Sequence, residues 1–378
     1  MTLPRYDTHV CVVSDQPMAN LLPVLLRDFT PRRVILLVTP AMKAKAEILQ
    51  RALRDRGCQV EQQPVPAYDV EGMRETVLQL AATLDESAIF NLTGGTKIMA
   101  LGIYDIIRDF DLPAFYLDTS TQQLIMLRPT QSPIPLPECL TVKTALAAQG
   151  FAIIDTGNLQ ILPQYRELTL KLVERAEAFQ RPLAQLNFLA QKALKNAAIS
   201  VTLEPESLEQ SDLLSLFCSA GLVTVDRDQL IFPSEDARFF VNGGWLEDYC
   251  SAVAQQLKKE GHIYDLAVNV TVKSHSDFKN EIDLAFTAHN QLHLIECKTA
   301  NLTASSAHDR QEARASNVSY KLETLRDMMG GRFGKAMLVT FMKLRQEDRS
   351  RCDSYNIKVV EGRQLTRLRE LLLQWINS

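Results

Sequence analysis

Short apolar runs alternate with amphipathic stretches through the first third of the chain, and this alternation restricts the fold more than any other feature. Apolar runs at residues 9–13, 34–38 and 88–92 predict buried strands. Amphipathic stretches such as 41–56 predict helices between them. Strands and helices in this alternation form βα units on a parallel sheet. We therefore expect an α/β protein whose N-terminal domain, residues 1–137, is Rossmann-like.

The remainder of the chain predicts two further domains. Four prolines between residues 129 and 137 indicate an extended connector that leaves the sheet. Residues 138–240 contain helical stretches followed by a hairpin, the order of a small winged-helix-like linker module. Such modules bind DNA or act as spacers, and because this region is not basic we interpret it as a spacer. Residues 241–378 start with a helix and continue as three strands, a helix and a strand, which predicts a mixed α/β domain.

Composition excludes several classes of protein. No apolar run in the 378 residues approaches the roughly 20 residues of a membrane span, so we expect no membrane partner. The N-terminus lacks the pattern of a signal peptide. The seven cysteines are scattered without a CxxC pair, which indicates free thiols and a cytoplasmic location. The net charge of -4, taken alone, argues against a nucleic-acid coat protein.

The net charge hides an uneven distribution along the chain. Residues 241–378 contain 19 Lys and Arg against 17 Asp and Glu, and residues 310–351 contain ten against five. A solvated helix face is the usual meaning of such a basic run. Beside an active site for phosphodiesters, the same run would lie along a phosphate backbone.

Asp283, Glu296 and Lys298 form the most informative constellation in the C-terminal half. The period of two in a strand places Glu296 and Lys298 on one face, and pairing with the preceding strand brings Asp283 beside them. Buried paired carboxylates need a neutralising cation, and oxygen ligands suit Mg²⁺ or Mn²⁺. Lys298 can orient a water or stabilise a negative transition state. The alternative is a plain surface salt bridge between two hairpin strands.

At these residues the chain resembles the PD-(D/E)XK nuclease superfamily. The acidic residue Asp283, followed after a spacer by Glu296-Cys-Lys298, matches the superfamily signature. The resemblance implies a further metal-binding carboxylate on the first helix, at Glu247, and a polar residue on the helix after the active-site strand, at Lys321. The metal ligands would then be Glu247, Asp283 and Glu296. Glu281 shares the strand face of Asp283, and we leave it open as an acidic neighbour or a solvated residue.

A glycine-containing turn in the N-terminal domain predicts a ligand site. Asn91-Leu-Thr-Gly-Gly-Thr-Lys97 ends a strand and opens a helix, so its backbone N–H groups and the helix N-terminus favour an anion. Thr93, Thr96 and Lys97 add hydroxyl groups and a positive charge. The turn matches neither the phosphate loop of nucleotide hydrolases nor the dinucleotide fingerprint. A bland Gly-Gly turn with a threonine cap remains the alternative.

The first strand is followed by Ser14-Asp-Gln-Pro17 and Asn20, and the fourth ends in Asn91-Leu-Thr-Gly-Gly-Thr-Lys97. These two motifs are similar to the ligand motifs of the CRISPR-associated Rossmann fold (CARF) family. Together with the C-terminal constellation, they make the whole chain resemble the cyclic-oligoadenylate-activated nucleases of type III CRISPR systems. The resemblance implies a homodimer that binds cyclic tetra-adenylate across two CARF domains. The implied ring contacts are Ser14, Gln16, Asn20, Thr39, Thr93, Gly94, Gly95, Thr96 and Lys97.

The sequence therefore predicts a Mn²⁺- or Mg²⁺-dependent endonuclease for DNA, RNA or both, switched on by the cyclic nucleotide in antiviral defence. Two alternatives remain. The first is a ligand-independent restriction or repair nuclease whose Rossmann-like domain only dimerises. The second is a nucleotide-sensing, DNA-binding regulator with an inactive nuclease core, against which the intact set of Asp283, Glu296 and Lys298 argues.

Overall fold

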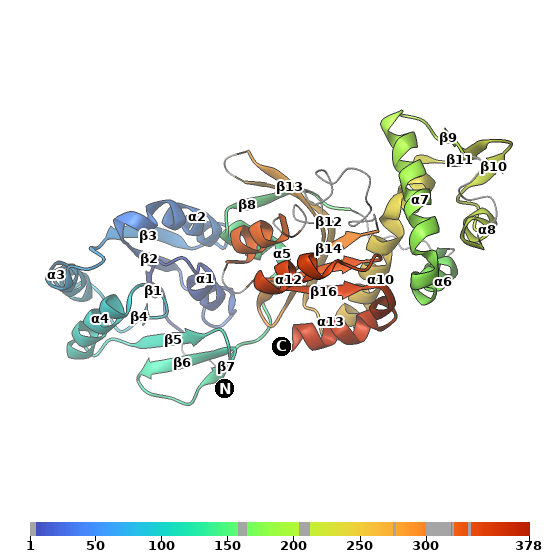
Figure 1. Cartoon of the computed structure of the whole chain (residues 1–378). Helices are drawn as coiled ribbons and strands as arrows, with labels where there is room; N and C mark the ends of the chain where they lie inside the picture. The colour runs from blue at the N-terminus through green and yellow to red at the C-terminus, as the bar shows by residue number, and fades with distance from the viewer. Residues whose placement is uncertain are drawn as a thin grey trace.

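The computed structural model describes residues 5–157, 165–203, 212–274, 277–299, 319, 321–331 and 334–378. In Figure 1 the N-terminal sheet lies at the left, a second sheet lies in the middle, and a small helical module with a short sheet lies at the right. None of the helices in these residues combines the length and apolarity that a membrane crossing requires.

The N-terminal domain contains the parallel sheet that the alternating pattern predicts. Its strand order is β3-β2-β1-β4-β5-β6-β7; β1 to β5 run parallel, whereas β6 and β7 are antiparallel additions at one edge. The elements are β1 (Thr8–Val12), α1 (Met18–Leu25), β2 (Arg33–Val38), η1 (Pro40–Met42), α2 (Lys43–Arg54), β3 (Gln59–Pro64), α3 (Val70–Ala81), β4 (Ala88–Asn91), α4 (Lys97–Asp109), β5 (Ala114–Asp118), β6 (Gln123–Arg128) and β7 (Ile134–Pro135).

The C-terminal domain is built on a six-stranded mixed sheet of order β16-β15-β14-β13-β12-β8. His289 and Asn290 both have positive φ, which fits the tight turn expected between β13 and β14. Beyond the expected core, the sheet gains β16 at one edge and β8, from the preceding region, at the other. The elements are α5 (Val142–Ala148), β8 (Phe151–Asp155), α9 (Glu235–Phe239), η3 (Phe240–Gly244), α10 (Trp245–Lys259), β12 (Asp265–Ser274), β13 (Lys279–Ala288), β14 (Gln291–Lys298), η4 (Arg326–Gly330), β15 (Lys335–Thr340), α12 (Gln346–Ser354), β16 (Ile357–Glu361), η6 (Gly362–Arg367) and α13 (Leu368–Ile376).

The small module consists of three helices and a three-stranded sheet of order β10-β11-β9. The sequence predicts helices over 166–180 and 183–197 with a break at Pro182, but the break lies at Arg175 and Pro182 is inside the second helix. A proline costs a helix one hydrogen bond, which the burial of side chains such as Leu183 and Leu186 offsets. The elements are α6 (Arg166–Glu174), α7 (Ala176–Lys195), β9 (Ser200–Thr202), α8 (Asp212–Ser219), β10 (Thr224–Asp226) and β11 (Gln229–Ile231).

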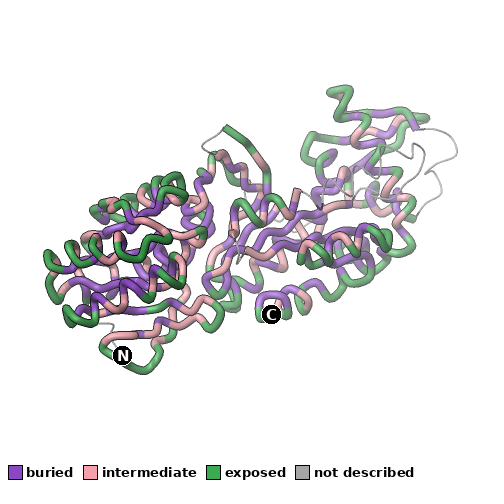
Figure 2. Tube along the Cα trace, turned by 60° about the vertical axis from the view of Figure 1, so that its left-hand side comes forward, coloured by how far each residue is buried: buried purple, intermediate pink, exposed green. Residues whose placement is uncertain are grey.

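Apolar packing joins the parts into one body, and Figure 2 shows that each part contains buried segments. One core combines Phe115 of the N-terminal sheet with Leu146, Val270 and Leu325. A second core unites the small module with the opposite face of the C-terminal sheet. The helical segment 321–330, which contains Leu325, therefore lies between the N-terminal domain and the C-terminal sheet.

Candidate nuclease and ligand sites

The strand pairing assembles the predicted carboxylate and lysine cluster. The register Leu284↔Ile295 between β13 and β14 places Asp283 opposite Glu296. Lys298 Nζ lies 2.8 Å from Glu296 Oε1 and 3.7 Å from Asp283 Oδ2, which also accepts the Cys297 N–H at 2.6 Å. Glu296 is only 2% exposed, so a plain surface salt bridge between hairpin strands is excluded.

Lys321 completes this cluster from a different element. Its Nζ donates to both carboxylate oxygens of Glu296, at 2.9 and 3.0 Å. The residue lies on the helical segment 321–330, whereas most of residues 314–320 of the expected helix lies outside the described residues. Three of the ten cations of the basic run, Arg310, Arg314 and Arg332, are likewise outside them.

Glu247 lies in the first turn of α10, close enough to interact with the strand carboxylates. Burial first, and then the charge of Asp283, raise the pKa of Glu247 to about 8. Burial and the charge of Glu296 raise the pKa of Asp283 to about 6. Burial lowers the pKa of Lys298, but Asp283 and Glu296 outweigh it and raise that pKa overall. The site thus concentrates negative charge in a buried volume, whereas Glu281 is exposed beside it.

The donor set fits a hard divalent cation only in part. Within the described residues, no group of three His, Cys, Asp or Glu side chains is arranged to coordinate a metal ion. The physical reason is visible at Glu296, whose oxygens are held by two lysines. Glu247 and Asp283 supply oxygen donors that repel each other without a cation between them. Mg²⁺ and Mn²⁺ accept one or two carboxylates and complete their shell with waters.

The polar ends of β1 and β4 are tied together in the N-terminal domain. Asn91 Nδ2 donates to Asn20 Oδ1 at 3.0 Å and to the Ala19 carbonyl at 2.8 Å, and Asn20 Nδ2 donates to the Val12 carbonyl. Thr93 Oγ1 donates to Asn91 Oδ1 and accepts the Leu117 N–H. Asn20 is buried, and its side-chain amide supports the loop.

The turn after β4 has the form that its glycines predict. A Cβ on Gly94 would lie 2.3 Å from the Val12 carbonyl oxygen, and Gly95 has φ +83, so neither position accepts a larger residue without displacement. Thr96 caps α4 by accepting the Met99 N–H. Lys97, the first residue of that helix, is exposed. Thr39 is buried and precedes η1 at the end of the neighbouring strand.

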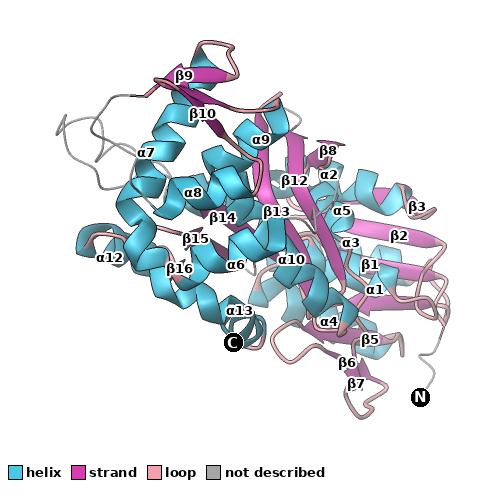
Figure 3. Ribbon diagram, turned by 90° about the vertical axis from the view of Figure 1, so that its right-hand side faces the viewer, coloured by secondary structure: helices cyan, strands magenta, loops and turns pink. Residues whose placement is uncertain are grey.

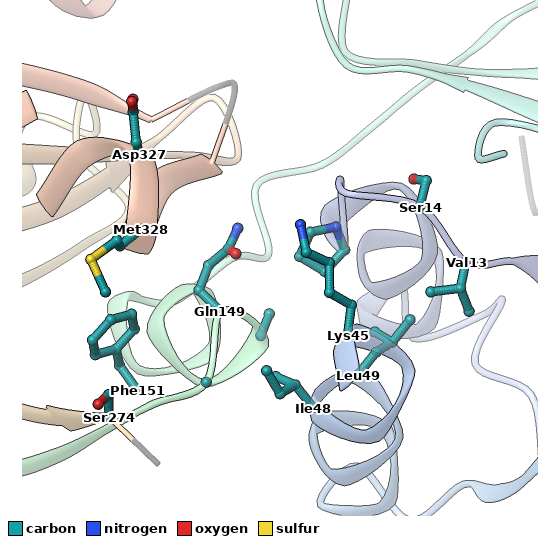
Figure 4. A pocket seen from close by; sticks show the side chains of 13 residues that line it. Val13, Ser14, Lys45, Ile48, Leu49, Gln149, Phe151, Ser274, Asp327 and Met328 are labelled. Carbon is teal, nitrogen blue, oxygen red and sulfur yellow. The ribbon is translucent and has the colours of Figure 1, made fainter. Parts of the chain in front are cut away.

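A cavity of about 420 Å³ opens between the N-terminal loop and the C-terminal domain. Figure 4 shows Ser14 and Lys45 on one side, Gln149 in the middle, and Asp327 and Met328 of η4 opposite. Lys45 forms an ion pair with Asp15. A Cβ on Gly331 would lie 2.8 Å from Gln149 Nε2 and 3.5 Å from Gln16 Oε1, so these three residues are packed together.

The fold defines a class: a Rossmann-like domain joined to a mixed α/β domain that contains a buried carboxylate and lysine cluster. Residues 8–144 match the family described as the Card1 CARF domain, and residues 234–378 match the Card1-like endonuclease domain. The chain belongs to the CARF-domain nucleases. The matched ranges do not test the three predicted domains 1–137, 138–240 and 241–378, whose boundaries stay predictions.

Solved structures support this assignment over nearly the whole chain. Can2 from Sulfobacillus thermosulfidooxidans in complex with cyclic tetra-adenylate is 29% identical, with a TM-score of 0.85 over 99% of this chain and 100% of that one. Protein VC1899 from Vibrio cholerae is 26% identical, with a TM-score of 0.87 over 98% of both chains. A type III CRISPR defence DNA nuclease activated by cyclic oligoadenylate is similar in fold alone: 19% identity, TM-score 0.54, 90% of this chain and 46% of that one. A search of the curated proteins found no match.

The structure also reveals residues that the sequence analysis did not select. Asn91, the polar residue that ends the buried strand β4, holds the two loops together. The position of this polar residue at the end of a buried strand is the sequence feature that could have indicated its role. Lys45 reaches the cavity from α2 and Gln149 from the position after the last residue of α5, and no sequence motif marks either residue. Only tertiary packing brings them there.

Proposed function

We propose that this CARF nuclease is a metal-dependent endonuclease for DNA, RNA or both, switched on by cyclic tetra-adenylate in type III CRISPR defence. The observation that carries the proposal is the buried cluster of Asp283, Glu296, Lys298 and Lys321 in the domain that matches an endonuclease family. Within this acidic site, the ammonium groups of Lys298 and Lys321 are the positive charges that can face a phosphate group.

The chemistry of the site follows from its charges. Glu247 and Asp283 would hold Mg²⁺ or Mn²⁺, with Glu296 joining once an ammonium group releases it. A bound divalent cation lowers the pKa of a water and stabilises charge on a phosphate oxygen. Lys298, which touches both strand carboxylates, orients the attacking water. Lys321 stabilises the negative charge that develops on the phosphate.

The ligand site fits an anionic ring on three grounds. Gly95 is exposed in the turn, the N-terminus of α4 favours negative charge, and Lys97 is exposed beside it. Ser14, Gln16 and Thr96 border the same strand ends. Can2, which is similar over its whole length, is described in complex with cyclic tetra-adenylate. Asn20, Thr39 and Thr93 would act by shaping these loops.

A second copy of the chain would complete the ring site. Ile98 and Leu101 on α4 are 45% and 71% exposed, next to the glycine turn. Exposed apolar residues in a cluster mark contact surfaces. We infer that α4 faces α4 of a partner subunit, which would bring two glycine turns to one ligand.

The decisive experiment measures cleavage of labelled single- and double-stranded DNA and RNA with Mn²⁺, with and without cyclic tetra-adenylate. We expect cutting only with both, and none after chelation with EDTA or in the Glu296→Ala and Lys298→Ala variants. If both variants cut as fast as the parent protein, the proposed nuclease site is refuted. Strong cutting without the ring, unchanged in Lys97→Ala, would favour a ligand-independent nuclease. Metal-independent DNA binding without any cutting would favour a regulator.

A further inference from the structure

One face of helix α7 in the small module presents cations and an aromatic ring to solvent. Arg181, Gln185, Phe188, Lys192 and Lys195 follow each other at spacings of four, three, four and three residues, so they share one helix face. All five are exposed, and Phe188 is 66% exposed although it is a large apolar residue. We call these five residues the α7 stripe.

The cations of the α7 stripe are not used to hold the fold together. Within the described residues, Arg181, Lys192 and Lys195 make no ion pair with an acidic side chain. The acidic residue on the same face, Glu177, is paired with Arg363 at 3.3 Å. Among the described residues, the stripe therefore carries three positive charges without an acidic partner around one exposed ring. The net charge of residues 138–240 is negative, with 9 Lys and Arg against 13 Asp and Glu, and it hides the stripe because it sums over all faces of the module.

The opposite edge of α7 is fixed to the nuclease site. Asn187 Nδ2 donates to Thr299 Oγ1 at 3.0 Å, and Thr299 directly follows Lys298. One turn along, Asn242 Nδ2 donates to Gln191 Oε1 at 2.9 Å. A Cβ on Gly243 would lie 2.1 Å from Thr299 Oγ1, so the backbone packs closely here. Figure 3 shows α7 standing beside the C-terminal sheet.

We propose that the α7 stripe binds the nucleic-acid strand on which the nuclease site acts, outside that site. This inference rests on the proposed function and assigns a role to the small module. Arg181, Lys192 and Lys195 contact phosphates along one strand, and Phe188, adjacent in sequence to the anchoring Asn187, stacks on an unpaired base. Cations along a backbone together with an aromatic stacking platform are the means by which proteins hold single strands without sequence preference.

Charge and shape favour this occupant over a protein partner. An apolar partner would gain nothing from three unpaired cations that surround the ring. A duplex would offer phosphates to the cations, but its bases are already stacked and leave Phe188 without a partner. An unpaired strand offers phosphates to the three cations of the stripe and an unstacked base to Phe188.

The test is binding of a fluorescent 20-nucleotide single strand to the full-length protein with cyclic tetra-adenylate and EDTA, followed by anisotropy at several salt concentrations. The triple variant Arg181→Gln, Lys192→Gln, Lys195→Gln should bind at least tenfold more weakly and lower the slope of log K against log salt by about two. Phe188→Ala should weaken binding roughly tenfold, and Phe188→Tyr should restore it. Thermal unfolding of each variant checks that the module is folded.

A matched control removes the same number of exposed cations elsewhere, for which the described part of the chain supplies no ion pair: Lys143→Gln, Lys259→Gln, Lys358→Gln. It should bind within twofold of the parent. In cleavage with Mn²⁺, the stripe variants should raise KM for a long strand and leave kcat unchanged.

Other outcomes separate the two proposals. If the parent cleaves on activation and the stripe variants bind and cleave as it does, the inference is overturned and the proposed function stands. If the parent never cleaves but the stripe variants lose binding, the proposed function fails and the stripe remains a nucleic-acid surface. The stacking role of Phe188 is overturned if a blunt duplex binds more tightly than the single strand and Phe188→Ala leaves the affinity for the duplex unchanged.

Discussion

Lys321 donates two hydrogen bonds to Glu296 from the same helical segment that supplies Asp327 and Met328 to the cavity beside the CARF loops. One rigid element therefore touches both the nuclease cluster and the ligand-binding half. A ring that enters against Ser14 and Gln16 meets this segment through Gln149 and Gly331. Shifting a packed helix by a small amount would move Lys321 relative to Glu296.

Removing Lys321 should impair the chemical step. Lys321→Ala leaves Glu296 with one cation and removes the charge that faces the phosphate, so we expect a loss of about 100-fold in single-turnover cleavage at saturating cyclic tetra-adenylate. Binding of the ring should not change. The matched control is the exposed Lys343, whose replacement by alanine should leave the rate intact. Full activity of Lys321→Ala would contradict the role of this residue.

Weakening the contact between the domains should uncouple activation from catalysis. Gln149 packs against Gly331, and Gln149→Ala removes that contact without touching either site's charged groups. We expect the ratio of cleavage rates with and without the ring to fall by at least fivefold, since allosteric couplings commonly amount to 5- to 150-fold. Gln374→Ala, an exposed position on α13, serves as control. An unchanged activation ratio would mean that the signal travels elsewhere.

The turn after β4 should tolerate no side chain at Gly94. A methyl group there lies 2.3 Å from the Val12 carbonyl oxygen, so the loop must shift. We expect Gly94→Ala to lower the free energy of unfolding by roughly 1–3 kcal/mol and to weaken ring binding in calorimetry. Gly330→Ala is the comparison, because nothing lies within 4 Å of its Cβ position. Equal stability of the two variants would argue against this packing.

Acid should destabilise the N-terminal domain through His9. Its ring packs on Phe29 at a centroid distance of 4.7 Å, neither nitrogen has a partner in the described residues, and burial lowers the pKa of His9 to about 3. The unfolded chain, with a histidine pKa of about 6.5, binds the proton first as pH falls. His9 therefore contributes to the free energy of unfolding in full above pH 6.5. Acidification lowers that free energy, by about 2 kcal/mol at pH 5.

Denaturant unfolding at pH 7, 6 and 5 measures this effect. His9→Leu should remove that share of the acid dependence, so the variant loses less stability than the parent between pH 7 and 5. The same measurement on His262→Leu, at an exposed position, is the control for replacing a histidine. Identical slopes for the parent and His9→Leu would refute the assignment.

A charge on the exposed face of α4 should separate the proposed dimer. Leu101 is 71% exposed next to the glycine turn. In Leu101→Glu two carboxylates would meet at the two-fold axis, so we expect the mass measured by light scattering to fall to that of a monomer. Ring binding should weaken with it. Leu170→Glu, on the small module, should keep the parent's mass, and a dimeric Leu101→Glu would place the interface elsewhere.

Much of the fold could be read from local patterns. The βα alternation predicted the strands and helices around β1 to β5, because buried parallel strands consist of short apolar runs. The pairing of Asp283 with Glu296 followed from the period of two and a tight turn. Tertiary packing overrode local signals at Pro182, which lies inside α7, and at β8, which pairs with β12 although it precedes the small module by sequence.

The sequence by itself determined the residue types of both sites: two acidic strand positions, a lysine two residues after Glu296, and a glycine turn between a strand and a helix. These follow from strand period and backbone freedom, which are properties of a few neighbouring residues. Only the tertiary structure decided which groups meet across the chain. Asn187 reaches Thr299, Gln149 reaches Gly331, and Lys321 reaches Glu296 because apolar cores bring distant segments together. Hydrophobic burial depends on the apolar area removed from water and not on specific partners, so no local pattern specifies those contacts.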